Sequence, residues 1–176
     1  YKLDIHLVER QGDVGCGATK ANTGIVHPGH EEDATKHPLR SMLCRQGNEC
    51  WQRWTQDLDI PARWPGELMV ARNAAEFEAL EHYLQLGEHN QVDGLRIIEG
   101  KEMQELEPLL HDDVVAALWA PSAGVIAPWE AVIGVVENAQ AIDVQKRPIS
   151  EVVDVETDGD TVTGLQTSQG LITADV

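Results

Sequence analysis

The chain has 176 residues, 42% of them hydrophobic, which is enough to bury the core of one large domain or of one domain and part of another. Its 13 Lys and Arg residues and 30 Asp and Glu residues give a formal net charge of -17. Such a charge repels nucleic acid and anionic lipid, so it excludes a nucleic-acid partner and predicts a soluble globular protein.

No apolar run approaches the ~20 residues that a transmembrane helix needs, so no transmembrane segment is expected. The amino-terminal residues also lack a charged region followed by an apolar signal core. The three cysteines, Cys16, Cys44 and Cys50, have no C-x-x-C spacing and predict neither a disulfide framework nor a zinc knuckle. We therefore expect a reducing, cytoplasmic location.

Both ends of the chain have the pattern of strands. Residues 3–8 cluster apolar side chains as a strand does, and charge at Glu9 and then Gly12 end the run. Residues 160–176 predict two strands around a turn at 168–170. Because both ends resemble the interior of a sheet, we expect a fragment of a longer chain; a complete small protein with terminal strands is the alternative.

The longest helix is expected before residue 61. Apolar side chains recur every three or four residues from Leu39 to Leu58, with Trp51 and Trp54 among them, while the other face is charged. Pro61 ends this pattern, because proline cannot continue a helix. We expect the apolar stripe, including both tryptophans, to be core.

Strands and helices then alternate. Asn73 with Glu76 three residues later predicts a capping box, and Pro128 suits the first turn of a helix. The expected elements are a strand at 66–72, a helix at 73–91, a strand at 95–100, a short helix at 100–108, a strand at 114–121, a helix at 127–141 and a hairpin at 148–167 that turns at 158–160. This order predicts an α/β or α+β chain with a mixed sheet.

Glu9 stands at a position with a known chemistry. In a dinucleotide-binding βαβ unit, an acidic residue that closes the second strand accepts hydrogen bonds from the ribose hydroxyls. The glycine loop of such a unit would lie about twenty residues upstream, before residue 1. A solvated glutamate at a strand end is the alternative.

Histidines and acids are dense in the stretch from 27 to 33. Nitrogen and oxygen ligands of this kind can hold a divalent metal. The residues are His27, His30, Glu31, Glu32 and Asp33. The intervening Pro-Gly bends the chain and the spacing matches no known site, so we expect a solvated acidic loop and no metal.

Several segments resemble one enzyme family. The stretch "DVGCGATKANTGIVHPG" is similar to the segment after the second strand in FAD-dependent oxidoreductases of the D-amino-acid-oxidase-like superfamily. The glycerol-3-phosphate dehydrogenases and the L-2-hydroxyglutarate dehydrogenases and oxidases are the most similar members. The likeness continues through "LDIPARWPGELMVARNAAEFEALE", "IIEGKEMQELEPLL", "VVAALWAPSAGVIAPWEAVIGVVENA" and "ISEVVDVETDGDTVTGLQTSQGLITADV".

The resemblance implies a partial FAD/NAD(P)-binding Rossmann-like domain with an inserted substrate domain of mixed sheet and helices. Residues 1–60 would form a partial FAD-binding segment, residues 61–145 a substrate-domain segment, and residues 146–176 a truncated β-hairpin region that returns to the FAD-binding domain. Because the glycine motifs that clasp the pyrophosphate lie outside the 176 residues, we expect this chain alone to bind FAD weakly or not at all.

The resemblance also implies cofactor contacts. Glu9 would hold the adenosine ribose, and Val152 would present its backbone to the adenine. Small residues let backbone N–H groups approach the pyrophosphate and the ribityl chain. Gly17, Ala18 and Thr19 would lie there, and Lys20, Asn22, Thr23, Gly24 and Ile25 would lie beside the flavin ring. From the residues alone, a tight glycine loop, a solvated lysine and a plain strand position are the alternatives.

His27 lies where these families keep a histidine near flavin and substrate, so it is the expected catalytic base; a structural histidine is the alternative. The implied reaction is hydride transfer to FAD from a small secondary alcohol, glycerol 3-phosphate or a 2-hydroxy acid such as L-2-hydroxyglutarate. An anionic substrate needs Arg or Lys, and the first cations after His27 are Lys36 and Arg40.

Two further expectations concern the parent protein. An enzyme of this kind implies an electron-acceptor partner, and it could lie at the periphery of the inner membrane. A non-catalytic substrate-binding or interaction module on the same scaffold, without flavin, is the alternative function, because a fold does not fix a function.

Overall fold

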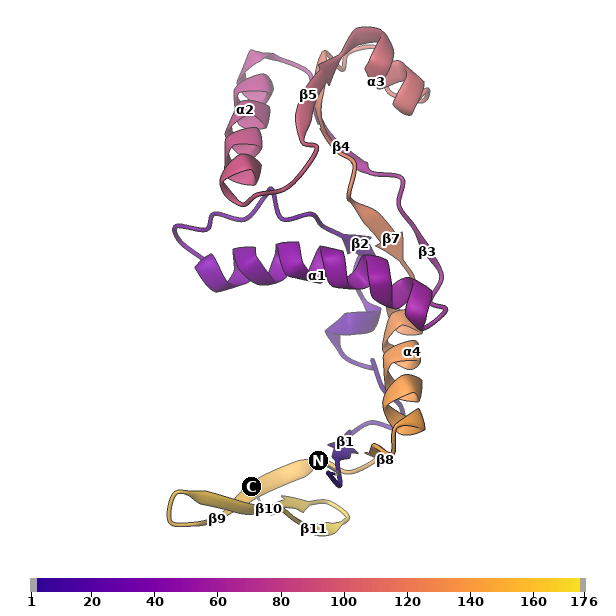
Figure 1. Ribbon diagram of the computed structural model, residues 1–176, viewed down its shortest axis with the longest axis vertical. Coiled ribbons are helices and arrows are strands. Elements are labelled where there is room, and N and C mark those ends of the chain that lie inside the picture. Colours follow the sequence, from indigo (N-terminus) through magenta and orange to yellow (C-terminus); the bar gives the residue numbers. More distant parts are fainter. Residues whose placement is uncertain (1–2, 175–176) are drawn as a thin grey trace. The chain divides into compact units, whose positions relative to one another are not determined.

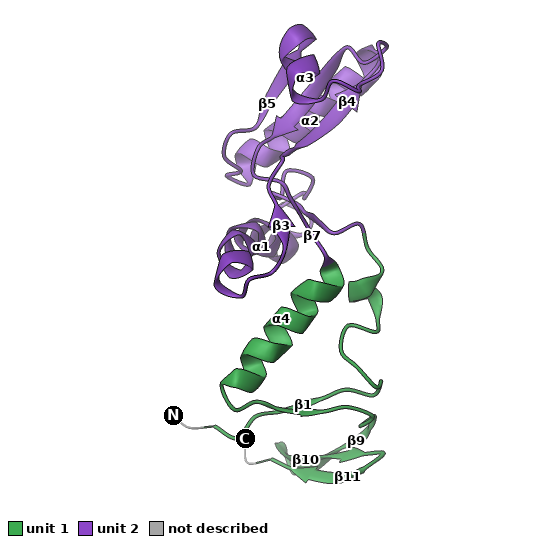
Figure 2. Cartoon of the chain, turned by 90° about the vertical axis from the view of Figure 1, so that its right-hand side faces the viewer, with its two compact units in different colours: residues 1–22, 128–176 green, residues 23–127 purple. Residues whose placement is uncertain are grey.

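The computed structural model describes residues 3–174, and Figure 1 shows the order of their helices and strands. The chain divides into two compact units (Figure 2). One unit holds residues 23–127, and the other holds the residues before 23 and those from 128 onwards. The division into 1–60, 61–145 and 146–176 stays a prediction.

A three-stranded antiparallel sheet forms the centre of the unit 23–127. Its order is β4-β6-β5, which confirms the three strands predicted for this region. Helix α2 packs against all three strands, and α3 contacts β5 and β6. The bounds are β4 Glu67–Ala71, α2 Ala74–His89, β5 Arg96–Glu99, α3 Gly100–Leu106 and β6 Ala116–Ala120.

Both faces of this sheet are buried. One core cluster gathers around Leu80 of α2 and Leu118 of β6, and the other around Met103 of α3 and Ala117 of β6. Neighbouring residues of a strand point to opposite faces, so Leu118 and Ala117 belong to different clusters. Burial on two faces explains why β6, the central strand, is apolar throughout.

The predicted cap of α2 is confirmed. The backbone N–H of Glu76 donates to the side-chain oxygen of Asn73 at 3.1 Å. The Glu76 carboxylate in turn accepts from the Asn73 side chain and from the backbone N–H of Arg72, each at 2.8 Å. These bonds satisfy donors that the first helical turn leaves without partners and fix where α2 begins.

A smaller antiparallel sheet in the same unit has the order β2-β7-β3. Its strands are two or three residues long, too short for an alternating pattern, and the sequence did not predict them. Helix α1 belongs to the same unit and is the longest helix. The bounds are β2 Ile25–Val26, α1 Pro38–Asp57, β3 Ala62–Arg63 and β7 Gly124–Ile126.

The prediction that the apolar stripe of α1 is core is wrong. Leu39 is 64% exposed and Trp54 is 38% exposed, whereas the buried residues of the helix are polar: Ser41, Asn48 and Thr55. The amide of Asn48 donates to the carbonyls of Val26 and Ser122 at 3.2 and 2.9 Å. Asn48 on the inner face of α1 therefore satisfies carbonyls of β2 and of the segment before β7, which require a donor rather than an apolar side chain.

The second unit pairs strands from the two ends of the chain. Strand β1 runs parallel to β8, with His6 opposite Gln145, and α4 begins at Pro128 as predicted. The antiparallel sheet β9-β10-β11 confirms both predicted hairpins, although residues 175 and 176 of the last predicted strand lie outside the described residues. The bounds are β1 His6–Val8, η1 Ala18–Lys20, α4 Pro128–Ala141, β8 Gln145–Arg147, β9 Val152–Asp158, β10 Thr161–Thr167 and β11 Gly170–Thr173.

The predicted mixture of helices with parallel and antiparallel strands is present. Within residues 3–174, no helix has the length and apolar content that crossing a bilayer requires.

Two helical glycines provide a test of the packing. A Cβ on Gly87 of α2 would lie 2.8 Å from the Cβ of His30 and 2.1 Å from Cδ1 of Leu95, whereas a Cβ on Gly47 of α1 would meet no atom within 4 Å. We expect Gly47→Ala to raise the free energy of unfolding by about 0.5–1 kcal/mol through helix propensity. Gly87→Ala should lower it by about 1–3 kcal/mol through overpacking. Urea unfolding measures the free energy of unfolding of both variants. An equal increase in Gly47→Ala and Gly87→Ala would refute the close packing of Gly87 against His30 and Leu95.

Candidate functional site

The loop that carries His27 and His30 lies between two helices. Gly29 has φ +104°, which favours glycine, and the atom nearest to the Cβ it lacks is the Arg45 backbone nitrogen of α1, at 3.4 Å. On the other side, the Asn90 amide after α2 donates to the carbonyls of Gly29 and Glu32 at 2.8 and 2.6 Å. The loop is therefore held by packing and by two hydrogen bonds.

Two histidines and two carboxylates meet at this loop; we call His27, His30, Glu31 and Glu67 the histidine–carboxylate cluster. His27 Nδ1 lies 3.6 Å from Glu31 Oε2 and 3.8 Å from Glu67 Oε2. His30 Nε2 lies 3.4 Å from Glu67 Oε1. Glu67 thus directs one carboxylate oxygen toward each histidine, at ion-pair distances longer than good hydrogen bonds.

Burial shapes the charge of this cluster. The side chain of His30 is fully buried, and neither of its ring nitrogens has a hydrogen-bond partner among the described residues. Burial lowers the pKa of His30, an effect that the negative charge of Glu31 partly offsets. Burial raises the pKa of Glu67, and the nearby His27 partly offsets that shift. Both shifts favour the neutral form of the group concerned.

His27 has one buried and one accessible side. Its Nδ1 atom is buried, yet the side chain as a whole is 40% exposed, so the exposed area belongs to its other atoms. Its carbonyl accepts a hydrogen bond from the Cys44 thiol of α1 at 3.7 Å. Part of the His27 side chain is therefore accessible, whereas Nδ1 faces the carboxylates of Glu31 and Glu67.

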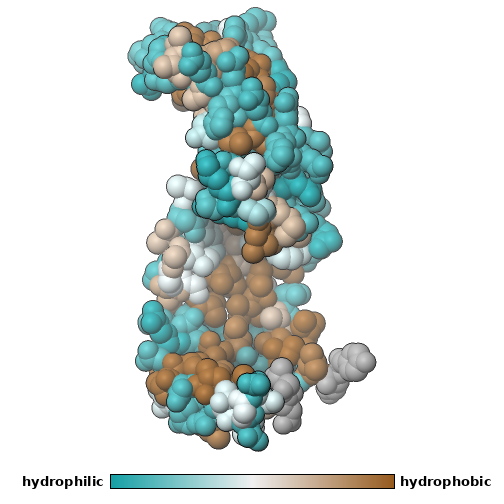
Figure 3. Space-filling view, turned by 90° about the vertical axis from the view of Figure 1, so that its left-hand side faces the viewer, coloured by the Kyte–Doolittle hydropathy of each residue, from teal (hydrophilic) through white to brown (hydrophobic). Residues whose placement is uncertain are grey.

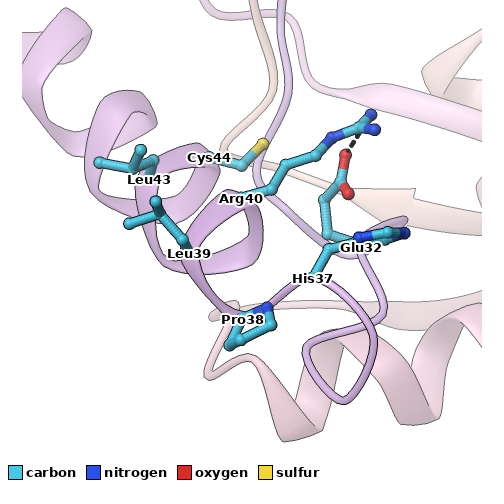
Figure 4. A pocket seen from close by; sticks show the side chains of 7 residues that line it. All are labelled: Glu32, His37, Pro38, Leu39, Arg40, Leu43 and Cys44. Carbon is cyan, nitrogen blue, oxygen red and sulfur yellow. Dashed lines mark ion pairs between the residues drawn. The ribbon is translucent and has the colours of Figure 1, made fainter.

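An open pocket of about 600 Å³ lies beside the loop at the start of α1 (Figure 4). Arg40 pairs across it with Glu32, with Nη2 2.8 Å from Oε1. Lys36 pairs with Asp33 at 2.8 Å, and this contact lowers the pKa of Asp33. The two cations considered for a substrate anion are thus each paired with an acid of the same loop.

The metal interpretation gains no support. Within residues 3–174, no three His, Cys, Asp or Glu side chains converge as a metal site requires. The acidic residues of the loop instead pair with cations and histidines.

Glu9 and Val152, the two residues expected near adenosine, lie in one part of the fold. Glu9 follows β1, and its N–H donates to the carbonyl of Arg147 at the end of β8, 3.0 Å away. Its own carbonyl accepts from the N–H of Ser150 at 2.8 Å, two residues before Val152 begins β9. The Glu9 carboxylate accepts from the backbone N–H of Gln11 at 2.8 Å. Glu9 thus follows the carboxyl end of β1, and the carboxyl end of the parallel strand β8 leads to Val152.

The small-residue stretch after Glu9 forms an exposed turn. Gly15 has φ +69°, and a Cβ there would lie 2.6 Å from Cγ1 of Val132 in α4, so only glycine fits. Beyond it, Gly17 precedes η1, and no atom lies within 4 Å of the position its Cβ would take. The predicted residues Gly17, Ala18, Thr19, Lys20 and Asn22 are all exposed here, and the Asn22 amide donates to the Thr19 carbonyl.

The remaining predicted flavin contacts belong to the unit of His27. Thr23 is exposed, Gly24 is buried with φ +74°, and its carbonyl accepts from the N–H of Ile126 at 2.9 Å. Ile25 lies in β2 opposite Val125 and is 40% exposed. Ile25 therefore lies two positions before His27, which directly follows β2.

Glu67 is the residue that sequence reasoning missed. It was part of the predicted strand "GELMVAR", and His30 was considered only as a metal ligand. The sequence does carry one signal. Glu67 is a single carboxylate at the start of an otherwise apolar run, and a half-buried carboxylate needs a partner.

The buried His30 predicts a pH dependence of stability. Because burial lowers its pKa in the folded state, the unfolded chain binds a proton at a higher pH than the folded protein does. The contribution of the neutral, buried His30 to the stability of the folded protein is present above the ordinary histidine pKa of about 6.5 and is lost as the pH falls below it. Urea unfolding at several pH values should show this loss, and His30→Gln should flatten it. Equal pH slopes for the two proteins would contradict the assignment.

Comparisons with known proteins point to one family. A family model described as FAD dependent oxidoreductase matches residues 1–176. Glycerol 3-phosphate dehydrogenase of Caloramator mitchellensis is 34% identical over 156 residues, which are 89% of this chain and 32% of that protein. Mitochondrial L-2-hydroxyglutarate dehydrogenase of Arabidopsis thaliana is 27% identical over 136 residues, 77% of this chain and 27% of that protein.

A solved structure agrees with the sequence comparisons. L-alpha-glycerophosphate oxidase of Mycoplasma pneumoniae with FAD bound superimposes with a TM-score of 0.80 at 26% identity, covering 95% of this chain and 43% of that chain. The chain spans a third or less of the length of the two sequence relatives. Because the family model matches all 176 residues, this protein belongs to the DAO family of FAD dependent oxidoreductases.

Proposed function

We propose that the chain is a segment of a longer FAD-dependent dehydrogenase that oxidises a small anionic secondary alcohol. Glycerol 3-phosphate is the first candidate substrate and L-2-hydroxyglutarate the second. The observation that carries the proposal is the 34% identity to a glycerol 3-phosphate dehydrogenase across 89% of this chain. The relative of 27% identity supports the second substrate.

The residues on this chain fit one part of FAD. A carboxylate at a strand end accepts hydrogen bonds from ribose hydroxyls, and Glu9 stands at the end of β1 beside the backbone that leads to Val152. The open space at Gly17 would let an anionic diphosphate approach the backbone. Lys20 at the end of η1 adds a positive charge to this turn.

In this proposal FAD, when bound, supplies an acceptor for the hydride that leaves the substrate carbon. Glu9 would orient the adenosine end, and Val152 would offer backbone groups to the adenine. Thr23, Gly24 and Ile25 would line the approach to the ring. His27 would take the proton of the substrate hydroxyl as that carbon becomes a carbonyl.

The substrate anion would be bound elsewhere than at the start of α1. Arg40 and Lys36 are each 2.8 Å from a carboxylate, so neither offers an unpaired charge to a phosphate. We propose that residues of the longer protein, outside these 176, provide the bidentate cation that such an anion favours.

Exposed apolar side chains support a longer protein. Val153 and Val155 of β9 and Leu171 of β11 are exposed, and Figure 3 shows hydrophobic residues gathered on the surface of the molecule. Such side chains often mark surfaces that other chain segments cover. We propose in addition an electron-acceptor partner and a location in the cytoplasm or at the periphery of the inner membrane.

The test uses the full-length protein reconstituted with FAD. We expect a bound flavin whose absorbance is bleached by glycerol 3-phosphate under anaerobic conditions. L-2-hydroxyglutarate serves as the competing substrate. Glu9→Ala should weaken FAD binding by roughly ten- to hundredfold, the equivalent of a hydrogen bond to a charged group.

Glu156→Ala is the matched control, because Glu156 is an exposed carboxylate of β9. It should leave FAD affinity unchanged. A full-length protein that holds no flavin would refute the proposal and favour the non-catalytic module. Bleaching by neither substrate would refute the proposed substrates.

A further inference from the structure

The histidine–carboxylate cluster contains a half-buried carboxylate that the proposed function does not use. Glu67 begins β4, and its side chain reaches both His27 and the buried His30. We propose that Glu67 is the positioning residue of His27: it holds the imidazole with the proton on Nδ1, so that Nε2 is the nitrogen that takes the substrate's hydroxyl proton. The role of Nε2 as acceptor of the substrate proton rests on the proposed function, whereas the tautomer of His27 rests on the cluster alone.

The orientation of the ring is the first support. Nδ1 is the His27 atom that faces the two carboxylates, and it is buried, so water does not compete for it. A carboxylate accepts a proton-bearing nitrogen and repels a lone pair, which favours Nδ1–H over the other tautomer. The neutral ring then carries its lone pair on Nε2, away from the carboxylates.

The place of Glu67 in the fold is the second support. The backbone of Glu67 pairs with Ala120 in the central sheet, which fixes where its side chain starts. Its second oxygen, Oε1, lies 3.4 Å from Nε2 of His30, and this oxygen has no hydrogen-bond partner among the described residues. His30 therefore lies against one carboxylate oxygen of Glu67 while the other, Oε2, faces His27.

His30 is itself immobilised. Its side chain is fully buried, Gly87 of α2 leaves room for its Cβ, and Asn90 bonds the carbonyl of the preceding Gly29. A chain of contacts thus runs from the end of α2 through His30 and Glu67 to His27. Positioning groups of this kind act through the base and do not touch the substrate.

Glu31 is the rival carboxylate, and it is closer to Nδ1 by 0.2 Å, at 3.6 Å against 3.8 Å. Its side chain is 44% exposed, whereas that of Glu67 is 22% exposed. Water and salt screen an exposed charge more than a half-buried one. We therefore expect Glu67 to contribute more to the orientation of His27 than Glu31 does.

In the proposed function, Nε2 of His27 would take the proton of the substrate hydroxyl, and FAD, when bound, would supply the acceptor for the hydride from the same carbon. The ring then bears protons on both nitrogens and a positive charge. Glu67 stabilises that charge, because its carboxylate faces the nitrogen that was protonated throughout. This step gives Glu67 an effect on rate rather than on substrate binding.

Histidine NMR measures the tautomer without reference to activity. In the full-length protein labelled with 15N-histidine, at a mildly alkaline pH, we expect His27 to carry its proton on Nδ1. His27→Gln assigns the signal. In Glu67→Gln, which preserves size and fold but not charge, the signal should shift toward the Nε2-protonated form.

Kinetics supply the second measurement. Glu67→Gln should lower kcat by about ten- to hundredfold, a part of the gain from general base catalysis, while KM stays within about twofold. Glu31→Gln should have a smaller effect on both kcat and the tautomer. Glu49→Gln, an exposed carboxylate of α1 paired with Arg45, is the surface control and should change neither.

The outcomes separate the two proposals. An Nε2-protonated His27 in the wild-type protein, or a tautomer that Glu67→Gln leaves unchanged, would overturn the role of Glu67. Equal effects of Glu31→Gln and Glu67→Gln would also overturn it. If neither substrate bleaches the flavin, the proposed function fails, and the tautomer measurement still decides whether Glu67 positions His27.

Discussion

The close packing of the His30 loop against α2 is the constraint on which the candidate site depends. His30 is fully buried, and its Cβ can lie where it does because residue 87 of α2 is glycine. Asn90 at the end of the same helix bonds the carbonyls of Gly29 and Glu32. A buried imidazole without hydrogen bonds costs free energy, so the surrounding packing must compensate for it. The loop is consequently held in one arrangement, with His27 at its start.

Glu67 connects that loop to the central sheet. Its backbone belongs to β4, whose register against β6 is set by apolar side chains buried on both faces. A slip of one residue would turn Glu67 toward the opposite face and exchange the β4 side chains between the two core clusters. The register that stabilises the unit therefore also determines which carboxylate reaches the two histidines, so core packing and the geometry of the site are coupled.

The sequence predicted those elements whose own pattern determines them. The capping box at Asn73, the start of α4 at Pro128 and both hairpins depend on residues near in sequence, and each is confirmed. The paired β2 and β7 depend on contacts across some hundred positions, as Ile25 with Val125, and have no local pattern. The same limit hid the approach of Glu67 to His30, because 37 positions separate them.

Helix α1 shows why an apolar stripe is a weak guide to burial at a site. Its side toward β2 must satisfy the carbonyls of Val26 and Ser122, and Asn48 does so with two hydrogen bonds. Satisfying buried carbonyls takes precedence there over burying Leu39 or Trp54, since an unpaired carbonyl costs more than an exposed apolar side chain that water tolerates. A polar inner face thus marks the helix that lies beside the loop of His27, where the carbonyls of Val26 and Ser122 need a donor.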